Sequence, residues 1–519
     1  MDHLHLIILV AFSTMMITLV IIVERVMVRL RPRCKCDICK SYLSRSWTQK
    51  FNNMSDWYAH LLRQSPTSTI HIHVMSNTIT ANPDNVEHML KTNFDNYPKG
   101  SPFSAILGDF LGRGIFVADG DNWRFQRKIA SLELGSVSIR TFSYEILSYE
   151  ISSRLVPLMT AAAASSSSVK LDLQDVFRRF SFDNICRFSF GIDPGCLRLS
   201  LPMSELAEAF DLASKLSAER ALVVSPWLWK LKRVLNLGSE KMLRDAIAKI
   251  DVLAGDIIQQ RKKMGFSSKR DLLSRFMNIM PDDEEYLRDI VVSFLLAGRD
   301  TVASALTMFF YLVSENPEVE ARIREEADRV LGRADPVGED IKPPIRKEMD
   351  RASTTGPDNR VPGIEKLKEL VYLHATIYES LRLFPPVQND SKFAKDDDVL
   401  PDGTVVRRGD KVTYHPYAMG RMEKIWGPDC DEFRPERWLK DGLFSPESPY
   451  RYPVFQAGVR VCLGKEMALV AMKTVAISII QRFDVRFVGP GRAPRFVPGL
   501  TATLSGGLPV VIRRRGSSS

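Results

Sequence analysis

The segment that decides the fold is Phe455-Gln-Ala-Gly-Val-Arg-Val-Cys-Leu-Gly464, followed by an apolar pattern at helical spacing from about 465 to 481. Cys462 therefore precedes a predicted helix, where free backbone N–H groups and the positive end of the helix dipole stabilise an anion. A thiolate at this position can bind iron. A lone cysteine is more often a small buried hydrophobe, but its neighbours make the metal-ligand interpretation the stronger one.

Those neighbours suit a flat, negatively charged cofactor. Gly458 and Gly464 have no Cβ, so the backbone can approach a planar ring closely. Arg460 offers a planar guanidinium that matches a carboxylate, and Phe455 completes the pattern. The sequence thus predicts a cofactor site around Cys462.

A second segment, over 285–314, predicts a helix that is apolar on nearly every face between 290 and 313. Such a helix either spans a membrane or lies at the centre of a large protein. Arg299 and Asp300 at its middle would be costly in lipid, which favours the protein interior. Ala297 and Gly298 leave room for a planar cofactor, and Asp300 with Thr301 can orient water and relay protons.

Two further segments supply cations. Glu379 and Arg382 lie one helical turn apart, and Arg437 follows in a Phe-Arg-Pro-Glu-Arg-Trp segment. Two arginines around one carboxylate would form a buried structural lock. Trp123 and Arg127 place an indole N–H and a guanidinium one turn apart, as donors for cofactor carboxylates or, alternatively, as a basic surface turn with a packed tryptophan.

Composition is that of a globular protein: of 519 residues, 45% are hydrophobic and 26% are charged. The net charge of +9 fits an anionic membrane surface or an acidic partner, and no zinc-finger spacing or basic-region heptad points to nucleic acid. Helical periodicity dominates, which predicts a mainly α fold with a minor β part. Strands are expected at 69–74 and 77–80, a helix start at Asn82-Pro83, and loops at 161–168 and 346–363.

The first thirty residues predict a transmembrane anchor. Residues 4–23 carry no formal charge, a length that suits a hydrocarbon core of about 30 Å, and basic residues follow from Arg25 to Lys35. A cleaved signal peptide fits less well, because no basic segment precedes the apolar stretch. We expect an anchor over 1–30, a juxtamembrane segment over 31–65, and a cytosolic catalytic domain over 66–519 at the endoplasmic reticulum.

Seven cysteines are few and unevenly spaced, so a reducing compartment is expected rather than a disulfide framework. Cys34, Cys36 and Cys39 have no further Cys or His pair nearby to complete four zinc ligands. The sequence favours incidental juxtamembrane thiols, open to acylation, over a metal site.

Taken in order, the Trp123/Arg127, 297–301, Glu379/Arg382, 433–437 and 455–464 segments resemble the cytochrome P-450 superfamily, over essentially everything after the anchor. The resemblance implies haem b between the 285–314 helix and the Cys462 loop, with Cys462 as the axial thiolate. It further implies propionate partners (Trp123, Arg127 and Arg460), an acid–alcohol pair (Asp300 and Thr301) and a structural triad (Glu379, Arg382 and Arg437).

Finer motifs over 96–100, 103–116, 125–128 and 417–423 are similar to the plant fatty-acid ω-hydroxylases of family 94. Residues 384–388, 455–458 and 498–503 resemble the subgroup that oxidises jasmonoyl-isoleucine and takes its 12-hydroxy form to the 12-carboxy form, lowering hormone activity. Asn389-Asp390 departs from the aromatic or Phe-Asp pair expected there, which leaves the substrate open.

The substrate wall is less certain from the residues themselves. Seven apolar side chains fit either an acyl-chain wall or ordinary packing: Phe103, Ile106, Leu107, Phe110, Leu111, Ile115 and Phe116. For the carboxylate of the substrate we take Lys99 as a candidate cation, with no pattern behind it.

No dinucleotide-binding glycine loop is present, so electrons must come from a partner. We expect an NADPH-cytochrome P-450 reductase to dock its acidic face near Arg127, Lys128, Arg421 and Lys465, with O2 and a lipid-like molecule as substrates. Two rival hypotheses are a reductase-independent hydroperoxide isomerase or lyase, which would typically lack the Asp-Thr pair, and an inactive membrane-bound scaffold.

Overall fold

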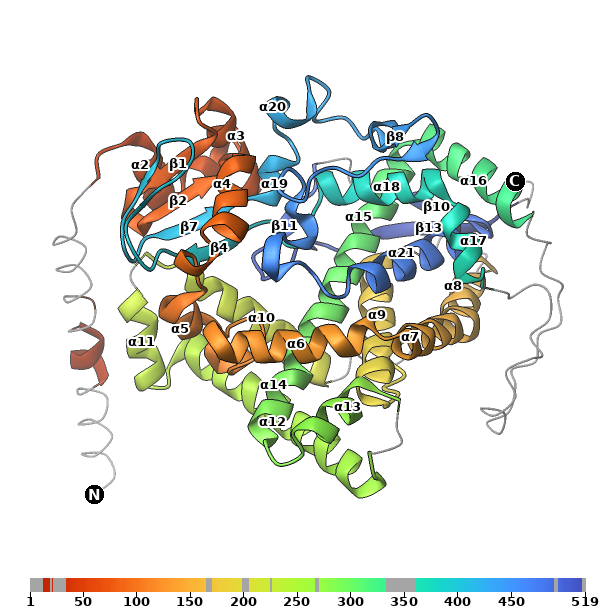
Figure 1. Ribbon diagram of the computed structural model, residues 1–519, viewed down its shortest axis with the longest axis horizontal. Helices are drawn as coiled ribbons and strands as arrows, with labels where there is room; N and C mark the ends of the chain where they lie inside the picture. The colour runs from red at the N-terminus through yellow and green to blue at the C-terminus, as the bar shows by residue number, and fades with distance from the viewer. Residues whose placement is uncertain are drawn as a thin grey trace.

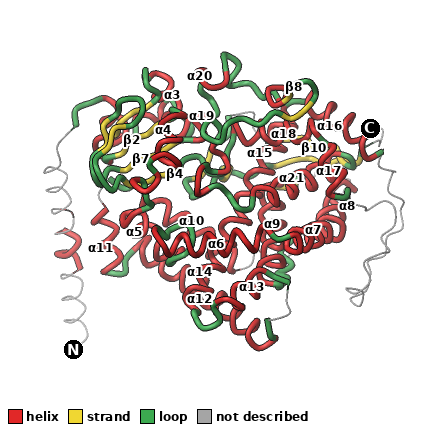
Figure 2. Tube along the Cα trace, in the orientation of Figure 1, coloured by secondary structure: helices red, strands yellow, loops and turns green. Residues whose placement is uncertain are grey.

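Helices carry most of the chain in the computed structural model, and strands form small sheets at two sides of the helical body (Figures 1 and 2). The structure describes residues 13–18, 21, 34–164, 170–197, 205–224, 226–266, 270–332, 361–489 and 493–515. The helices are α2 (Asp37–Ser44), α3 (Met54–Gln64), α4 (Pro83–Glu87), α5 (Gly100–Leu111), α6 (Gly120–Gly135), α7 (Val137–Glu150), α8 (Val156–Ala164), α9 (Leu173–Phe190), α10 (Glu205–Ala221), α11 (Pro226–Val234), α12 (Gly238–Met264), α13 (Leu272–Ile279), α14 (Glu284–Leu295), α15 (Thr301–Glu315), α16 (Pro317–Leu331), α17 (Ile364–Glu369), α18 (Val371–Leu383), α19 (Pro416–Met419), α20 (Glu423–Trp426) and α21 (Lys465–Ile480).

The larger sheet has the order β1-β2-β7-β4, in which β2 and β7 are parallel and the other pairs antiparallel. A second sheet has the order β10-β13-β3, and the remaining strands pair as β5-β6, β8-β9 and β11-β12. The strands are β1 (Thr69–Ile72), β2 (Asn77–Thr80), β3 (Leu171–Asp172), β4 (Asp390–Phe393), β5 (Asp398–Val399), β6 (Val405–Val406), β7 (Lys411–Tyr414), β8 (Leu439–Lys440), β9 (Leu443–Phe444), β10 (Phe483–Phe487), β11 (Phe496–Val497), β12 (Thr503–Leu504) and β13 (Pro509–Arg514).

The long apolar helix lies inside the protein, as predicted. It comprises α14, a π-helical turn over Leu296–Asp300 and α15, and it packs against α9, α18 and α21 (Figure 1). Among the described residues, Glu284–Glu315 is a helix long and apolar enough to cross a membrane. Its most apolar 18-residue stretch has a mean hydropathy of 1.4, yet 67% of that stretch is buried in the protein. The mid-helix charges therefore meet protein partners instead of lipid.

Several local predictions are confirmed and two are corrected. The Asn82 side chain accepts a hydrogen bond from the Asp84 N–H at 2.9 Å with Pro83 in the first turn, which is the predicted helix start. The first strand ends at Ile72 instead of 74, because His73–Met75 form a 3₁₀ turn. The loop predicted over 161–168 is wrong at its start, where an alanine run extends α8 to Ala164, since alanine is the strongest helix former.

Other predictions fall largely outside the described residues. Of the loop over 346–363, only 361–363 are described, and they are irregular. Of the membrane helix over 4–23, the structure describes 13–18 and 21, which are helical, with Met15, Ile17 and Ile21 exposed.

Candidate functional site

The Cys462 loop places its thiol at the wall of a large internal cavity. The loop runs through short 3₁₀ turns over Pro453–Phe455 and Gly458–Arg460, and the Cys462 N–H donates to the Phe455 carbonyl at 2.8 Å. Gly464 is the N-cap of α21, which begins at Lys465. The Cys462 side chain lines this cavity, and its accessible surface faces the cavity.

Electrostatic effects on this thiol oppose one another. Burial raises the pKa of Cys462, whereas the backbone N–H groups of Gly464 and Lys465 and the charges of Arg127 and Lys465 lower it. Burial has the larger effect, so the pKa of the Cys462 thiol lies above its ordinary value, although the helix start and the two cations act in the predicted direction. A bound metal ion would bring about the deprotonation, because a coordinating thiol loses its proton outright.

Thr301 lies in the cavity wall together with Ala297 and Gly298. Its hydroxyl donates to the Ala297 carbonyl at 2.6 Å, across the π-helical turn that precedes α15. A Cβ on Gly298 would lie 2.4 Å from Ile185 Cδ1, so this glycine also permits the close packing of the long helix on α9. The small residues predicted beside the cofactor are therefore present at the cavity.

Asp300 is not brought to the cavity with Thr301. Its buried carboxylate lies 3.1 Å from Arg299 Nη1, and the same Nη1 lies 2.5 Å from Asp211. Asp211 in turn lies 3.5 Å from Arg178, and both side chains are partly exposed. Burial raises the pKa of the Asp300 carboxyl, although Arg299 and Arg178 lower it. The ion pairs thus connect Asp300 with the surface.

The cavity has a volume of about 1530 Å³, beyond the roughly 300–1,000 Å³ of ordinary small-molecule pockets. It therefore has room for a cofactor and a substrate together. Six of the seven apolar residues considered for an acyl-chain wall line it: Phe103, Ile106, Leu107, Leu111, Ile115 and Phe116. Phe110 does not. It is fully buried and its ring packs against that of Phe210.

The three predicted propionate partners all line this cavity. The Arg460 guanidinium carbon lies 4.4 Å from the centre of the Trp123 ring, and its Nη2 donates to Asp119 Oδ1 at 2.7 Å and to the Ala118 carbonyl at 3.0 Å. Arg460 Nε is buried and has no hydrogen-bond partner among the described residues. Arg127 donates to the Val461 carbonyl, beside Cys462.

Sequence reasoning missed a group of charges in the same wall. Lys99 lies 2.5 Å from Asp390 Oδ1 and Lys392 lies 2.8 Å from Asp390 Oδ2, while Lys411 is a further neighbour. Burial lowers the pKa of Lys392 to about 7 and that of Lys411 to about 8. The sequence did contain a sign of this group, because Asp390 and Lys392 are two residues apart in a short strand and therefore lie on the same face. Lys99, the candidate anchor for a substrate carboxylate, is held by Asp390 instead.

The structure assigns Gly458 a different role from the predicted one. Gly458 has a φ of +61°, and a Cβ there would lie 2.0 Å from the Leu90 carbonyl oxygen, so packing against the chain near Leu90 requires this glycine. Gly458 is not part of the cavity wall. Phe455 does line the cavity.

The predicted structural lock is present. Glu379 and Arg382 are fully buried, and two bonds of 2.8 Å join the Arg382 Nε and Nη2 to the Glu379 carboxylate. Arg437 Nε donates to Glu379 Oε1 at 3.1 Å, and Trp438 Nε1 donates to Oε2 at 2.9 Å. None of these four residues lines the cavity, and their bonds join α18 to the turn over Pro435–Trp438.

The four cations of the expected docking face differ in their surroundings. Arg421 donates to the Leu383 and Tyr417 carbonyls, and its guanidinium stacks 3.7 Å from the centre of the Tyr417 ring. The guanidinium of Arg421 is thus engaged in contacts within the protein. Lys128 is exposed, and Arg127 and Lys465 are half-buried.

These features fit haem. A thiol at a helix start faces the cavity, small residues and a hydroxyl line the same space, and a band of cations can meet two propionates, with Arg460 Nε still without an acceptor. The fold and the site define a haem-thiolate oxygenase.

Comparison with known proteins agrees. The family model for cytochrome P450 matches residues 44–504. Cytochrome P450 94C1 of Arabidopsis thaliana is 60% identical over 93% of this chain and 94% of its own length. Cytochrome P450 94B1 of the same plant is 45% identical over 91% and 89%, and cytochrome P450 94A2 of Vicia sativa is 44% identical over 90% and 88%. The chain belongs to the cytochrome P450 family, within family 94 of the plant enzymes, and is a monooxygenase whose cofactor is haem.

Proposed function

We propose that Cys462 is the axial thiolate of the haem iron and that the protein oxidises the terminal (ω) carbon of a fatty-acyl-type carboxylate. The substrate we propose is jasmonoyl-isoleucine, together with its 12-hydroxy derivative, which is taken on to the 12-carboxy form. Each turnover joins one atom of O2 to the substrate and reduces the other to water, with electrons from NADPH through the reductase.

The observation that carries this proposal is the shared cavity. The thiol of Cys462 and the hydroxyl of Thr301 line one space, whose remaining wall is largely apolar. When bound, haem supplies O–O bond cleavage, which a thiolate ligand favours. The protein's own part is to hold the substrate, exclude water and supply protons.

Cationic side chains hold the propionates in this proposal. Arg127, Arg460 and Trp123 supply donors from α6 and the cysteine loop, while Lys99 and Lys392 add charge from α5 and β4. Asp390 and Asp119 offset part of that charge, which keeps the cations packed before the cofactor is bound.

Protons reach the cavity through Asp300 and Thr301. Asp211 and Arg178 are partly exposed and connect through Arg299 to the buried Asp300 carboxyl. Because burial raises the pKa of Asp300, this carboxyl can hold a proton more readily than an ordinary aspartate. A side-chain rotation or a water molecule then carries the proton to the Thr301 hydroxyl, which lies in the cavity wall.

The substrate proposal rests on the wall and on the sequence resemblance. Six apolar side chains from 103 to 116 suit an acyl chain. Asn389 lies in the same wall, is exposed, and forms no hydrogen bond within the described residues. Its carboxamide can therefore bind a polar group of the substrate, such as an amide or a carboxylate.

The basic residues after 4–23 support a single-pass anchor in the endoplasmic reticulum membrane, with the catalytic domain in the cytosol. We propose that the reductase docks at the face where Lys128 and, within the cysteine loop, Val459 and Val461 are exposed. Raised salt should then slow reduction of the unfused pair. Equal rates at low and high salt would contradict this docking mode.

The alternative within the same chemistry is a general hydroxylase of medium- or long-chain fatty acids, which the apolar wall also supports. A reductase-independent hydroperoxide isomerase is less well supported, because Thr301 is present and lines the cavity.

The deciding experiment measures microsomal turnover of jasmonoyl-isoleucine, its 12-hydroxy derivative and lauric acid in parallel, with products identified by mass. We expect NADPH-dependent formation of the 12-carboxy product. Preference for lauric acid would favour the general hydroxylase, and turnover of a fatty hydroperoxide without NADPH would favour the isomerase.

The haem ligand is tested separately by the difference spectrum of the reduced, carbon-monoxide-bound protein. Cys462→Ala should lose the thiolate Soret band, whereas Cys430→Ser should retain it. A thiolate band in Cys462→Ala would assign the ligand to another residue.

A further inference from the structure

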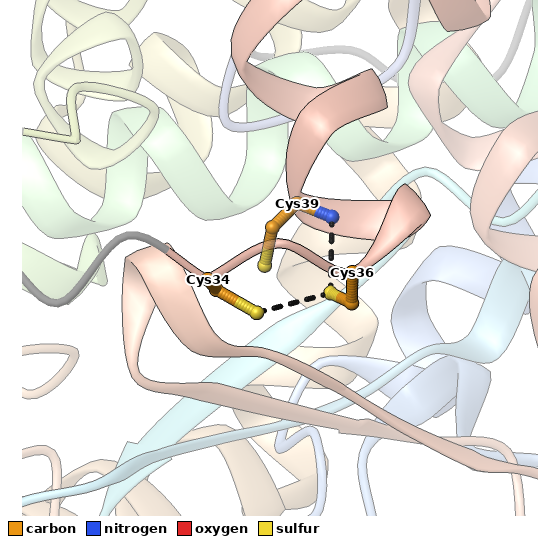
Figure 3. A group of neighbouring side chains, drawn as sticks. All are labelled: Cys34, Cys36 and Cys39. Atoms are coloured by element: carbon orange, nitrogen blue, oxygen red, sulfur yellow. Dashed lines mark hydrogen bonds between the residues drawn. The ribbon is translucent and has the colours of Figure 1, made fainter.

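Three thiols meet at the start of α2, in the segment that precedes the catalytic body (Figure 3). The sulfur atoms of Cys34, Cys36 and Cys39 all lie within 4.8 Å of one another. Cys34 Sγ and Cys36 Sγ are 3.2 Å apart. Cys39 is fully buried, and the other two are half-buried. In Figure 3 the three side chains point toward a common centre from one short stretch of chain.

The local backbone creates this arrangement. Cys36 is the N-cap of α2 in an extended conformation, and Cys39 lies in the first helical turn. The Cys39 N–H donates to Cys36 Sγ at 3.5 Å. A Cys-x-x-Cys pair across a helix start thus directs both sulfurs to one side, and an extended residue brings Cys34 to the same point. N–H donors to sulfur also stabilise thiolates.

The distances suit one small thiophilic ion. Zinc–sulfur bonds are about 2.3 Å long, which separates the sulfurs around one ion by roughly 4 Å. The three sulfurs of this cluster already lie within that range or close to it. No His, Asp or Glu side chain of the described residues joins the group, so a fourth position would be open to water or to a small thiol.

We propose that Cys34, Cys36 and Cys39 bind a single thiophilic cation, Zn²⁺ or Cu⁺. Soft thiolate ligands select these ions over the harder Mg²⁺ and Ca²⁺. The sequence favoured incidental thiols because no fourth ligand was evident, and the closeness of the three sulfurs is the observation that favours a metal site instead. Acylation cannot involve all three sulfurs, because Cys39 is inaccessible. A disulfide between Cys34 and Cys36 would leave Cys39 unused and is disfavoured in a reducing compartment.

The ion would fix the first part of the substrate channel. Tyr42, a few residues further along α2, donates its hydroxyl to the Leu222 carbonyl at 3.1 Å. Tyr42, Leu43 and Trp47 line the cavity. A cation at the start of α2 would therefore fix this helix and, with it, the part of the wall that Tyr42, Leu43 and Trp47 form.

The test uses the full-length, haem-loaded protein purified in detergent after growth with added zinc or added copper. Metal content is measured against haem iron by plasma mass spectrometry, and X-ray absorption at the zinc or copper edge reports the atoms bound to the metal. We expect about one equivalent of zinc or copper, bound by three sulfurs at about 2.3 Å. The two growth conditions distinguish the two ions.

Variants localise the ion. The Cys34→Ser/Cys36→Ser/Cys39→Ala protein should lose at least about nine-tenths of the metal, while the matched control Cys430→Ser should keep it. The carbon-monoxide spectrum checks that each variant is folded. If the triple variant does not fold, Cys34→Ser alone, at a half-buried position, should release the metal to a chelator at least about tenfold faster than the wild type.

Several outcomes would overturn the proposal. The first two are a wild-type metal content no higher than that of the variants and a metal bound only through nitrogen or oxygen. The other two are seen by mass spectrometry: the loss of two hydrogens, which would indicate a disulfide between Cys34 and Cys36, and the added mass of an acyl group on either cysteine.

Discussion

Replacing Glu379 by glutamine should destabilise the protein far more than its small change in shape suggests. The Glu379 carboxylate is fully buried and accepts five hydrogen bonds. Oε2 accepts from Arg382 Nε and Trp438 Nε1, and Oε1 accepts from Arg382 Nη2, Arg437 Nε and the Arg434 N–H. In glutamine, an NH2 group replaces one of these two oxygens, and because it is itself a donor it cannot accept the hydrogen bonds that point at it.

The magnitude follows from these contacts. In the better orientation of glutamine, two buried donors lose their acceptor, at about 1–3 kcal/mol each. The lost charge also leaves Arg382, which is fully buried, and Arg437 without their carboxylate. Breaking a buried ion pair typically costs about 3–5 kcal/mol. We therefore expect Glu379→Gln to lower the free energy of unfolding by about 3–5 kcal/mol, a large share of the usual 5–15 kcal/mol.

Urea unfolding of the detergent-solubilised protein, followed by tryptophan fluorescence, measures this loss. Glu436→Gln is the matched control, because Glu436 also pairs with an arginine, Arg322, and bonds to Tyr372, but at a partly exposed position. The control should cost no more than about 1 kcal/mol. Equal stabilities of Glu379→Gln and Glu436→Gln would refute the reasoning.

Three further predictions follow from single side chains. Thr301→Ala should keep the thiolate spectrum but lower the coupling, the fraction of NADPH consumed that yields product, by roughly tenfold or more. The control Thr307→Ala, which loses a similar bond to the Ala303 carbonyl (2.7 Å) outside the cavity, should keep its coupling. Equal coupling in both variants would remove Thr301 from the proton path. Burial lowers the pKa of His415 to about 3 from its ordinary 6.5, so its contribution to stability is complete above pH 6.5 and is lost as the pH falls toward 3. At pH 5 this loss is about 2 kcal/mol. His415→Asn, which keeps a side chain able to cap α19, should make the free energy of urea unfolding depend less on pH, and an unchanged pH dependence would contradict the role given to His415. Asn389→Phe should lower the ratio of kcat/KM for jasmonoyl-isoleucine to that for lauric acid by roughly fivefold, the equivalent of one hydrogen bond of about 1 kcal/mol, whereas Asn389→Gln should preserve it, and a ratio unaffected by phenylalanine would place the polar contact elsewhere.

The features that sequence predicted well are those encoded locally. Cys462 next to a helix start, and Glu379 one turn from Arg382, depend on spacings of a few residues, and the structure reproduces both. The interior position of Glu284–Glu315 followed from its lack of a polar face together with the charged Arg299 and Asp300 at its middle. In each case a periodicity or a helix boundary determined the outcome.

The features that sequence missed depend on long-range contacts. Lys99 and Asp390 meet only because α5 packs against β4. Gly458 is needed because a carbonyl of a distant segment, at Leu90, approaches its backbone. Arg421 resembled a surface cation until its aromatic neighbours, Phe384 and Tyr417, were placed around it. No periodic pattern reports such contacts.

The position of Tyr42, Leu43 and Trp47 in the cavity wall has a kinetic consequence. These residues follow closely in sequence on the proposed anchor, so with that anchor in a bilayer this part of the cavity wall would lie near the membrane, where an oily substrate accumulates. The enzyme would then respond to the amount of substrate per lipid instead of the amount per volume of buffer. An apparent KM would rise on dilution into extra empty vesicles, even though no residue of the active centre had changed.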